Sequence, residues 1–144
     1  MATKYSTQIT NGEGPRALHA GLQVARGVYA GVDATLSASD TIQMVRIPNK
    51  AVVLDMQVSG TAGAAATVVK IGDGGDDDRF GTVTLSATSQ FLRSNAASGH
   101  CYQYSLSDDA SPLYDTIDIT IQSASSVTTT ASIVLSVAYY MPPA

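Results

Sequence analysis

Apolar residues occupy every second position along three segments of the chain, which is the pattern of β-strands with one buried face. The segments span residues 51–59, 117–122 and 132–139. Their apolar positions are Val52, Leu54, Met56 and Val58, then Ile117, Ile119 and Ile121, and finally Ile133, Leu135, Val137 and Tyr139. We therefore predict three strands that place these side chains in a hydrophobic core.

Five further segments show a shorter or interrupted alternation, and we predict that they are strands as well. They span 22–30, 41–47, 66–71, 82–86 and 101–104. Pro48 has no backbone donor, so it marks a turn or the margin of a sheet after the second of these strands. No segment has the apolar spacing of a long amphipathic helix. About eight closely spaced strands predict an all-β fold, an antiparallel β-sandwich, and this number favours a jelly roll over an open barrel.

The first 20 residues are polar and rich in glycine, and the sequence from Asn11 to Pro15 is a strong break in regular structure. We therefore divide the chain into an N-terminal arm, residues 1–20, and a single β-sandwich domain, residues 21–144. Tyr5 and Ile9 alternate with polar residues in the arm, as in a short strand. The arm is either a frayed terminus or a segment that becomes ordered on a neighbouring subunit.

Charged residues make up only 14% of the chain, and the net charge is -4. So few charges suit a β-rich protein whose surface is partly covered by neighbouring molecules. The acidic balance and the scattered basic residues argue against nucleic-acid binding. No apolar run is long enough to span a membrane, so we expect neither a nucleic-acid nor a membrane partner. The single cysteine, Cys101, cannot form an internal disulfide, so nothing requires an oxidising compartment.

The acidic, glycine-rich stretch 72–78 is predicted to be a loop and has two interpretations. Four carboxylates, those of Asp73, Asp76, Asp77 and Asp78, are the oxygen ligands that a hard cation such as Ca²⁺ prefers. Their spacing does not match an EF-hand loop. The alternative is a solvated turn in which one aspartate caps the loop and another pairs with Arg79. The second interpretation is favoured, so we predict no metal and no other cofactor.

Catalytic signatures are missing from the sequence. His100 and Cys101 are adjacent, and adjacent residues on a strand point to opposite faces, so they form a poor thiolate-imidazole pair. His19 is far away in the sequence. No nucleophile elbow, zinc-ligand spacing or phosphate-binding loop is present. We therefore predict that the protein is not an enzyme.

Five tyrosines could form an aromatic platform for sugar rings, or they could bridge the core and the rim or anchor a subunit interface. They are Tyr102, Tyr104, Tyr114, Tyr139 and Tyr140. Because the chain has no tryptophan, the second interpretation is favoured.

Several short motifs occur in an order that resembles a known family. They are Val45-Arg46-Ile47-Pro48, Ala51-Val52-Val53-Leu54-Asp55, Gly72-Asp73 followed by further aspartates and Arg79-Phe80, Tyr114 to Thr120, and Tyr139-Tyr140. The chain resembles the decoration, or cement, proteins that stabilise the heads of tailed bacteriophages.

This resemblance implies a structural virion protein, made in the cytoplasm of a bacterial host, that decorates the outside of an icosahedral capsid. It would bridge neighbouring subunits of the major capsid protein and form a homotrimer. The predicted interface residues come from the arm, the acidic loop and a surface loop over 87–99, and are Tyr5, Ile9, Arg16, Arg79, Phe91 and Arg93. The alternative function is a glycan-binding jelly-roll module of a phage head fibre or tail component.

Overall fold

The structure is a computed structural model, and it describes residues 2–6, 10, 21–31, 35–63, 67–85, 90–93, 102–103, 114–122 and 126–142, with only the backbone described for 90–93 and 102–103. Ten strands are formed by these residues. They are β1 (Thr3–Tyr5), β2 (Leu22–Ala30), β3 (Thr41–Pro48), β4 (Val52–Thr61), β5 (Thr67–Asp73), β6 (Asp76–Leu85), β7 (Gln90–Arg93), β8 (Tyr102–Gln103), β9 (Tyr114–Ile121) and β10 (Ser132–Tyr140).

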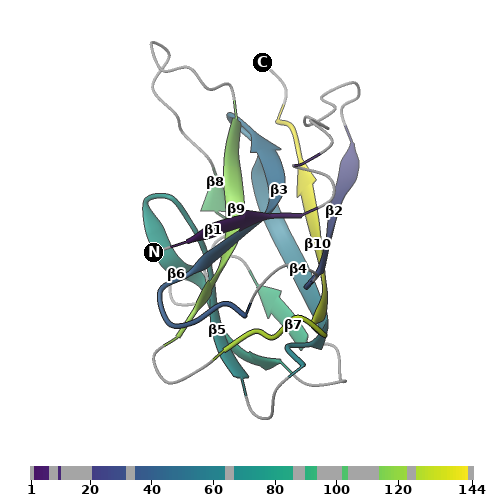
Figure 1. Cartoon of the computed structure of the whole chain (residues 1–144). Coiled ribbons are helices and arrows are strands. Elements are labelled where there is room, and N and C mark those ends of the chain that lie inside the picture. The colour runs from purple at the N-terminus through teal and green to yellow at the C-terminus, as the bar shows by residue number, and fades with distance from the viewer. Residues whose placement is uncertain are drawn as a thin grey trace.

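The strands form two sheets that pack face to face (Figure 1). Sheet A has the order β1-β3-β9-β5-β6, and sheet B has the order β2-β10-β4-β7 with β8 also paired to β4. The described pairings are antiparallel, apart from the parallel pair of β1 and β3. The predicted all-β sandwich is confirmed. Consecutive strands such as β2 and β3 lie in different sheets, as two Greek keys require, and the jelly roll remains our interpretation of this order.

The core lies between the two sheets. The alternation predicted for β9 and β10 places the apolar side chains of these strands in it. The isoleucines of β9 are buried, and so are the four apolar residues at every second position of β10. Each fully buried aliphatic side chain of this size contributes about 1.5 to 3 kcal/mol to folding. These two strands, which lie inside their sheets, therefore make a large contribution to core stability.

The alternation predicted for β4 is interrupted at Leu54, which was expected in the core. Val53 lies opposite Tyr139 of β10, and Asp55 lies opposite the preceding residue of β10, so Leu54 is an extra residue without a partner. This β-bulge reverses the phase of the alternation between the residues before Leu54 and those after it. Val53 is consequently fully buried, whereas Leu54 is only partly buried.

Residues 2–6, at the start of the predicted arm, are attached to sheet A of their own chain. Strand β1 lies beside β3, and the buried hydroxyl of Ser6 donates a hydrogen bond to a backbone carbonyl of β3. Asp40 accepts hydrogen bonds from the backbone N–H groups of Ala2 (2.6 Å) and Ser37 (3.0 Å). These backbone donors hold the pKa of Asp40 below its ordinary value. The arm boundary at residue 20 stays a prediction, because residues 11–20 lie outside the described part.

The surface loop predicted over 87–99 contains a strand instead, β7. Phe91 lies opposite Gln57 of β4, and Arg93 lies opposite Asp55. The reason is that the backbone groups of β4 on the side away from β10 need partners, and a short strand supplies them. Phe91 and Arg93, predicted as interface residues, are thus in an edge strand of sheet B, and their side chains lie outside the described part.

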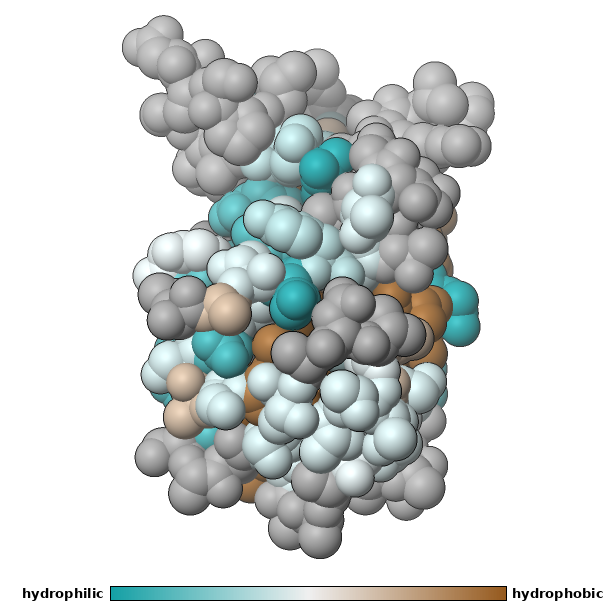
Figure 2. Space-filling model, in the orientation of Figure 1, coloured by the Kyte–Doolittle hydropathy of each residue, from teal (hydrophilic) through white to brown (hydrophobic). Residues whose placement is uncertain are grey.

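The surface of the molecule over sheet A is mainly polar (Figure 2). Figure 2 shows mainly hydrophilic and neutral residues over sheet A, and a brown, hydrophobic margin at the right, where Figure 1 places β2 and β10. Within the described ranges, no helix has the length and apolar character needed to cross a membrane.

Candidate functional site

The acidic stretch predicted as a loop is a tight β-hairpin. Strand β5 ends at Asp73 and β6 begins at Asp76, so only Gly74 and Gly75 form the turn. Asp73 and Asp76 are paired across it. Three consecutive aspartates are unusual in a strand, and here Lys70 of the neighbouring strand contacts Asp77 and Asp78. This finding corrects the predicted loop.

Asp73 fixes the turn and is nearly inaccessible, with 2% of its side chain exposed. Its Oδ1 accepts hydrogen bonds from the backbone N–H groups of Gly75 and Asp76, both at 3.0 Å. The guanidinium of Arg79 binds both carboxylate oxygens, with Nε 2.6 Å from Oδ2 and Nη2 3.2 Å from Oδ1. One residue therefore provides both features of the predicted turn, the capping aspartate and the partner of Arg79. Such charge-assisted, bidentate contacts are among the stronger polar interactions in proteins.

We expect Asp73→Ala to lower the free energy of unfolding by about 2 kcal/mol, because it leaves two turn N–H groups and Arg79 without their acceptor. Urea unfolding measures the change. Lys70→Ala is the matched control, because it removes an exposed ion pair of the same hairpin and should change stability by only about 0.5 kcal/mol. Equal effects of the two substitutions would contradict the role assigned to Asp73.

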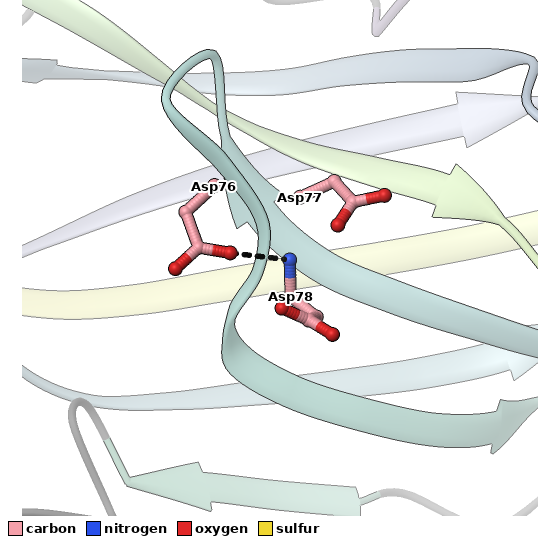
Figure 3. Close-up of side chains that lie close together, drawn as sticks. All are labelled: Asp76, Asp77 and Asp78. Carbon is pink, nitrogen blue, oxygen red and sulfur yellow. Dashed lines mark hydrogen bonds between the residues drawn. The ribbon is translucent and has the colours of Figure 1, made fainter.

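The other three aspartates, Asp76, Asp77 and Asp78, form an exposed cluster at the start of β6 (Figure 3). One carboxylate oxygen from each lies within 4.8 Å of the others. Lys70 Nζ lies 3.2 Å and 3.0 Å from the two oxygens of Asp77 and 4.0 Å from Asp78 Oδ2. The hydrogen bond with Asp77 raises the pKa of Lys70. Asp76 Oδ1 accepts a hydrogen bond from the backbone N–H of Asp78 at 3.3 Å.

These contacts are those of a solvated ion-pair network. A Ca²⁺ ion needs six to eight oxygen ligands, and the cluster presents three exposed carboxylates. Asp73, the fourth candidate, is already used by Arg79 and the turn. Lys70 already supplies positive charge to Asp77 and Asp78.

We therefore expect the melting temperature to change by less than about 1 °C when Ca²⁺ is added or a chelator is present, since only specific binding to the folded state raises stability. Differential scanning fluorimetry measures the shift. A larger increase with Ca²⁺ that disappears in Asp77→Asn would show that the cluster holds a metal.

The start of β6 folds over the outer face of sheet A at Gly72. Between the pair of Ile71 with Gly81 and the pair of Asp73 with Asp76, β6 contributes four residues and β5 contributes Gly72 alone. A Cβ atom on Gly72 would lie 2.1 Å from the carbonyl oxygen of Asp76. Only glycine permits so close a backbone approach.

Asp118 of β9 is the cross-strand partner of Gly72 and is therefore on the same face, beside this fold. It is buried, with 7% of its surface exposed, and its Oδ1 has no hydrogen-bond partner among the described residues. Burial raises the pKa of Asp118 to about 7, although a hydrogen bond with Thr116 opposes the shift, and the nearby carboxylates of Asp115 and Asp73 raise it further. Burial is also the main cause that raises the pKa of Asp115.

The predicted interface residues are not brought together by the described structure. Tyr5 is on β1 and half exposed, whereas Arg79 is mostly buried against Asp73 of its own chain. Ile9 and Arg16 lie outside the described residues. The sequence analysis missed Lys70 and Asp118. Lys70 alternates with buried residues of β5, so its place on the outer face could have been predicted. Asp118 alternates with isoleucines, and that pattern predicted an exposed side chain.

The described tyrosines do not share a surface. Tyr139 is buried and its hydroxyl donates a hydrogen bond to Gln23 Oε1 at 2.9 Å, while Tyr140 is on the opposite face of β10. Tyr114 lies beneath the guanidinium of Arg46, 4.7 Å from ring centroid to Cζ. His19, His100 and Cys101 lie outside the described part.

Chains of three solved phage capsid structures have a similar fold. A chain of the capsid asymmetric unit of cyanophage Pam1 aligns with a TM-score of 0.61 over 89% of this chain and 90% of that chain, at 16% sequence identity. A chain of the acid-stable capsid of Helicobacter pylori bacteriophage KHP30 gives 0.57 over 88% and 92%, at 13% identity. A chain of the capsid of Ralstonia phage GP4 gives 0.65 over 99% and 100%, at 14% identity.

At these identities the similarity shows a shared fold. The alignments extend over almost the whole length of each chain, so the sandwich as a whole is the unit compared. No protein-family model matches the sequence, and no curated protein matches it.

Proposed function

We propose that this chain is a structural virion protein that decorates the outside of an icosahedral phage capsid and bridges neighbouring capsid subunits. The observation that supports the proposal most is the full-length similarity of fold to chains from three phage capsid structures. The order of sequence motifs, which resembles decoration proteins, supports it independently.

The physical character of the sandwich suits such a role. The chain is rich in threonine, serine and alanine, and only 14% of its residues are charged. Short side chains lose little conformational entropy when they are immobilised at an interface. Many copies of a modest contact on a lattice then give high avidity. The protein would reinforce the shell by bridging its subunits, without catalysis and without a cofactor.

The proposal includes a homotrimer and an N-terminal arm that contacts a neighbour. Because residues 2–6 pair with β3 in the same chain, the contacting part of the arm would be residues 7–20, with Ile9 and Arg16. Glycan binding by a head fibre or tail module stays the alternative, although no described cluster of exposed tyrosines favours it.

Co-sedimentation tests the proposed function. Purified protein is mixed with empty shells assembled from the major capsid protein of the phage that encodes this chain, before and after shell expansion. We expect saturable binding to expanded shells that survives an excess of soluble oligosaccharide. Absence of binding to both kinds of shell would contradict the proposal, and competition by the oligosaccharide would favour the glycan-binding alternative.

A further inference from the structure

The two lateral sides of the sandwich end in edge strands with different chemistry. Strand β2 ends sheet B and approaches β3 of sheet A, whereas β6 ends sheet A and approaches β4 and β7 of sheet B. The two edges are therefore on opposite sides of the molecule, and Figure 1 shows β2 at the right and β6 at the left. We call them the β2 side and the β6 side.

On the β2 side, the outer face of β2 is apolar with one basic group. Leu22 and Val24, on the outer face of β2, are 68% and 64% exposed, and Tyr140 of β10 lies beside Leu22 and is 37% exposed. These are the large apolar side chains exposed on sheet B in the described part. Arg26, the next residue on the same face, is also exposed. In the described part of the chain, β2 pairs with β10 alone.

The β6 side is acidic. Asp76, Asp77 and Asp78 are exposed at its start, and the side chains of Asp77 and Asp78 remain 50% and 54% exposed despite their contacts with Lys70. Aspartates and a bulge at an edge strand prevent pairing of that edge with a copy of itself, because like charges would meet. The β2 edge has no comparable group of charges that would block association.

We propose that a second copy of this chain docks head to tail, with the β2 side of one copy against the β6 side of the next. Arg26 then faces the aspartate cluster of the neighbour, and the exposed apolar residues of β2 become buried. Two different surfaces meet in this contact, so it is heterologous and closes into a ring when the rotation between copies is suitable. A contact of β2 with itself would bury the same apolar residues but would offer Arg26 no acidic partner from β2.

This inference rests on the proposed function for the number of copies. It deepens that proposal because it names the surfaces through which a trimer forms. The charge complementarity between Arg26 and the cluster selects the partner side, and burial of Leu22 and Val24 contributes affinity. The interaction would weaken as salt screens the charges.

Light scattering of the purified full-length chain, combined with charge reversal, tests it. Wild type should have about three times the monomer mass of 14.9 kDa. Arg26→Glu and Asp78→Lys should each weaken association about tenfold or more, because each places like charges together. The chain with both substitutions should associate more strongly than Arg26→Glu alone, since the cluster then offers a cation to the new carboxylate. Lys50→Glu, an exposed charge change in the turn before β4, is the control and should leave the mass unchanged.

A monomeric wild type would overturn the inference, and so would a double variant that associates no better than Arg26→Glu alone. Melting temperatures equal to wild type show that the variants are folded. Shell binding is measured separately. A trimer that fails to bind shells would contradict the proposed function and leave the head-to-tail contact intact. A monomer that binds shells would contradict the head-to-tail contact and support the proposed function.

Discussion

Asp118→Asn should stabilise the protein at neutral and alkaline pH. The pKa of Asp118 is about 7 in the folded protein, against an ordinary value of 3.8. Between these values the folded state holds a proton that the unfolded chain has released, so stability falls as the pH rises. Above the folded pKa, the free energy of unfolding is up to about 4 kcal/mol lower than at acidic pH, because each pKa unit corresponds to 1.36 kcal/mol.

Asparagine has almost the same shape and no charge, so it removes this penalty. We expect Asp118→Asn to raise the free energy of unfolding by about 2 to 4 kcal/mol at about pH 8 and to change it little at about pH 4. The corresponding increase in melting temperature at the higher pH is about 5 to 12 °C. Urea unfolding across the pH range measures the difference between variant and wild type.

The control for Asp118→Asn is Asp55→Asn, which neutralises an exposed carboxylate and should not reproduce the stabilisation at about pH 8. A difference between Asp118→Asn and wild type that stays constant from acidic to alkaline pH would show that Asp118 does not titrate as the structure implies. A destabilised variant at about pH 8 would have the same meaning, because it would show that the carboxylate stabilises the fold.

Gly72→Ala should destabilise the protein by about 3 kcal/mol, because its Cβ would lie 2.1 Å from a backbone oxygen of the hairpin, and backbone yields less readily than a side chain. The start of β6 would have to move away from sheet A. That movement would expose Asp118, so the pH dependence of stability should also become weaker.

Gly74→Ala is the matched control for Gly72→Ala, since a Cβ at Gly74 meets nothing within 4 Å in the same hairpin. It should change the free energy of unfolding by only about 0.5 kcal/mol, in either direction. Urea unfolding of both variants checks the pair of predictions. Similar stabilities for the two would show that the hairpin does not press on sheet A as the structure describes.

Much of the sandwich was predictable because a half-buried strand has a side-chain period of two, and β9 and β10 follow this period without interruption. The bulge at Leu54 was not predictable, because one extra residue in a strand leaves no mark in composition and becomes visible only through the register with β10. Strand β7 was missed for a similar reason, since its four residues pair with β4 but have too short a pattern to stand out.

At the candidate site, the capping and ion pairing of Asp73 were predictable in kind, because aspartate and glycine in sequence are typical of turns. The aspartates of β6 oppose strand formation by their own preferences, so the hairpin depends on its contacts with β5. Asp118 alternates with buried isoleucines and was therefore expected on a wet face. Its burial comes from a hairpin about 40 residues earlier in the sequence, and local pattern contains no information about such a contact.

Cryo-electron microscopy of particles of the phage that encodes this chain would test the central claim most directly. We expect density that fits the two-sheet sandwich on the outer surface of the capsid, in contact with at least two neighbouring capsid subunits. Density for the sandwich confined to the tail or to fibres, or its absence from the virion, would contradict the proposed role in decorating the capsid.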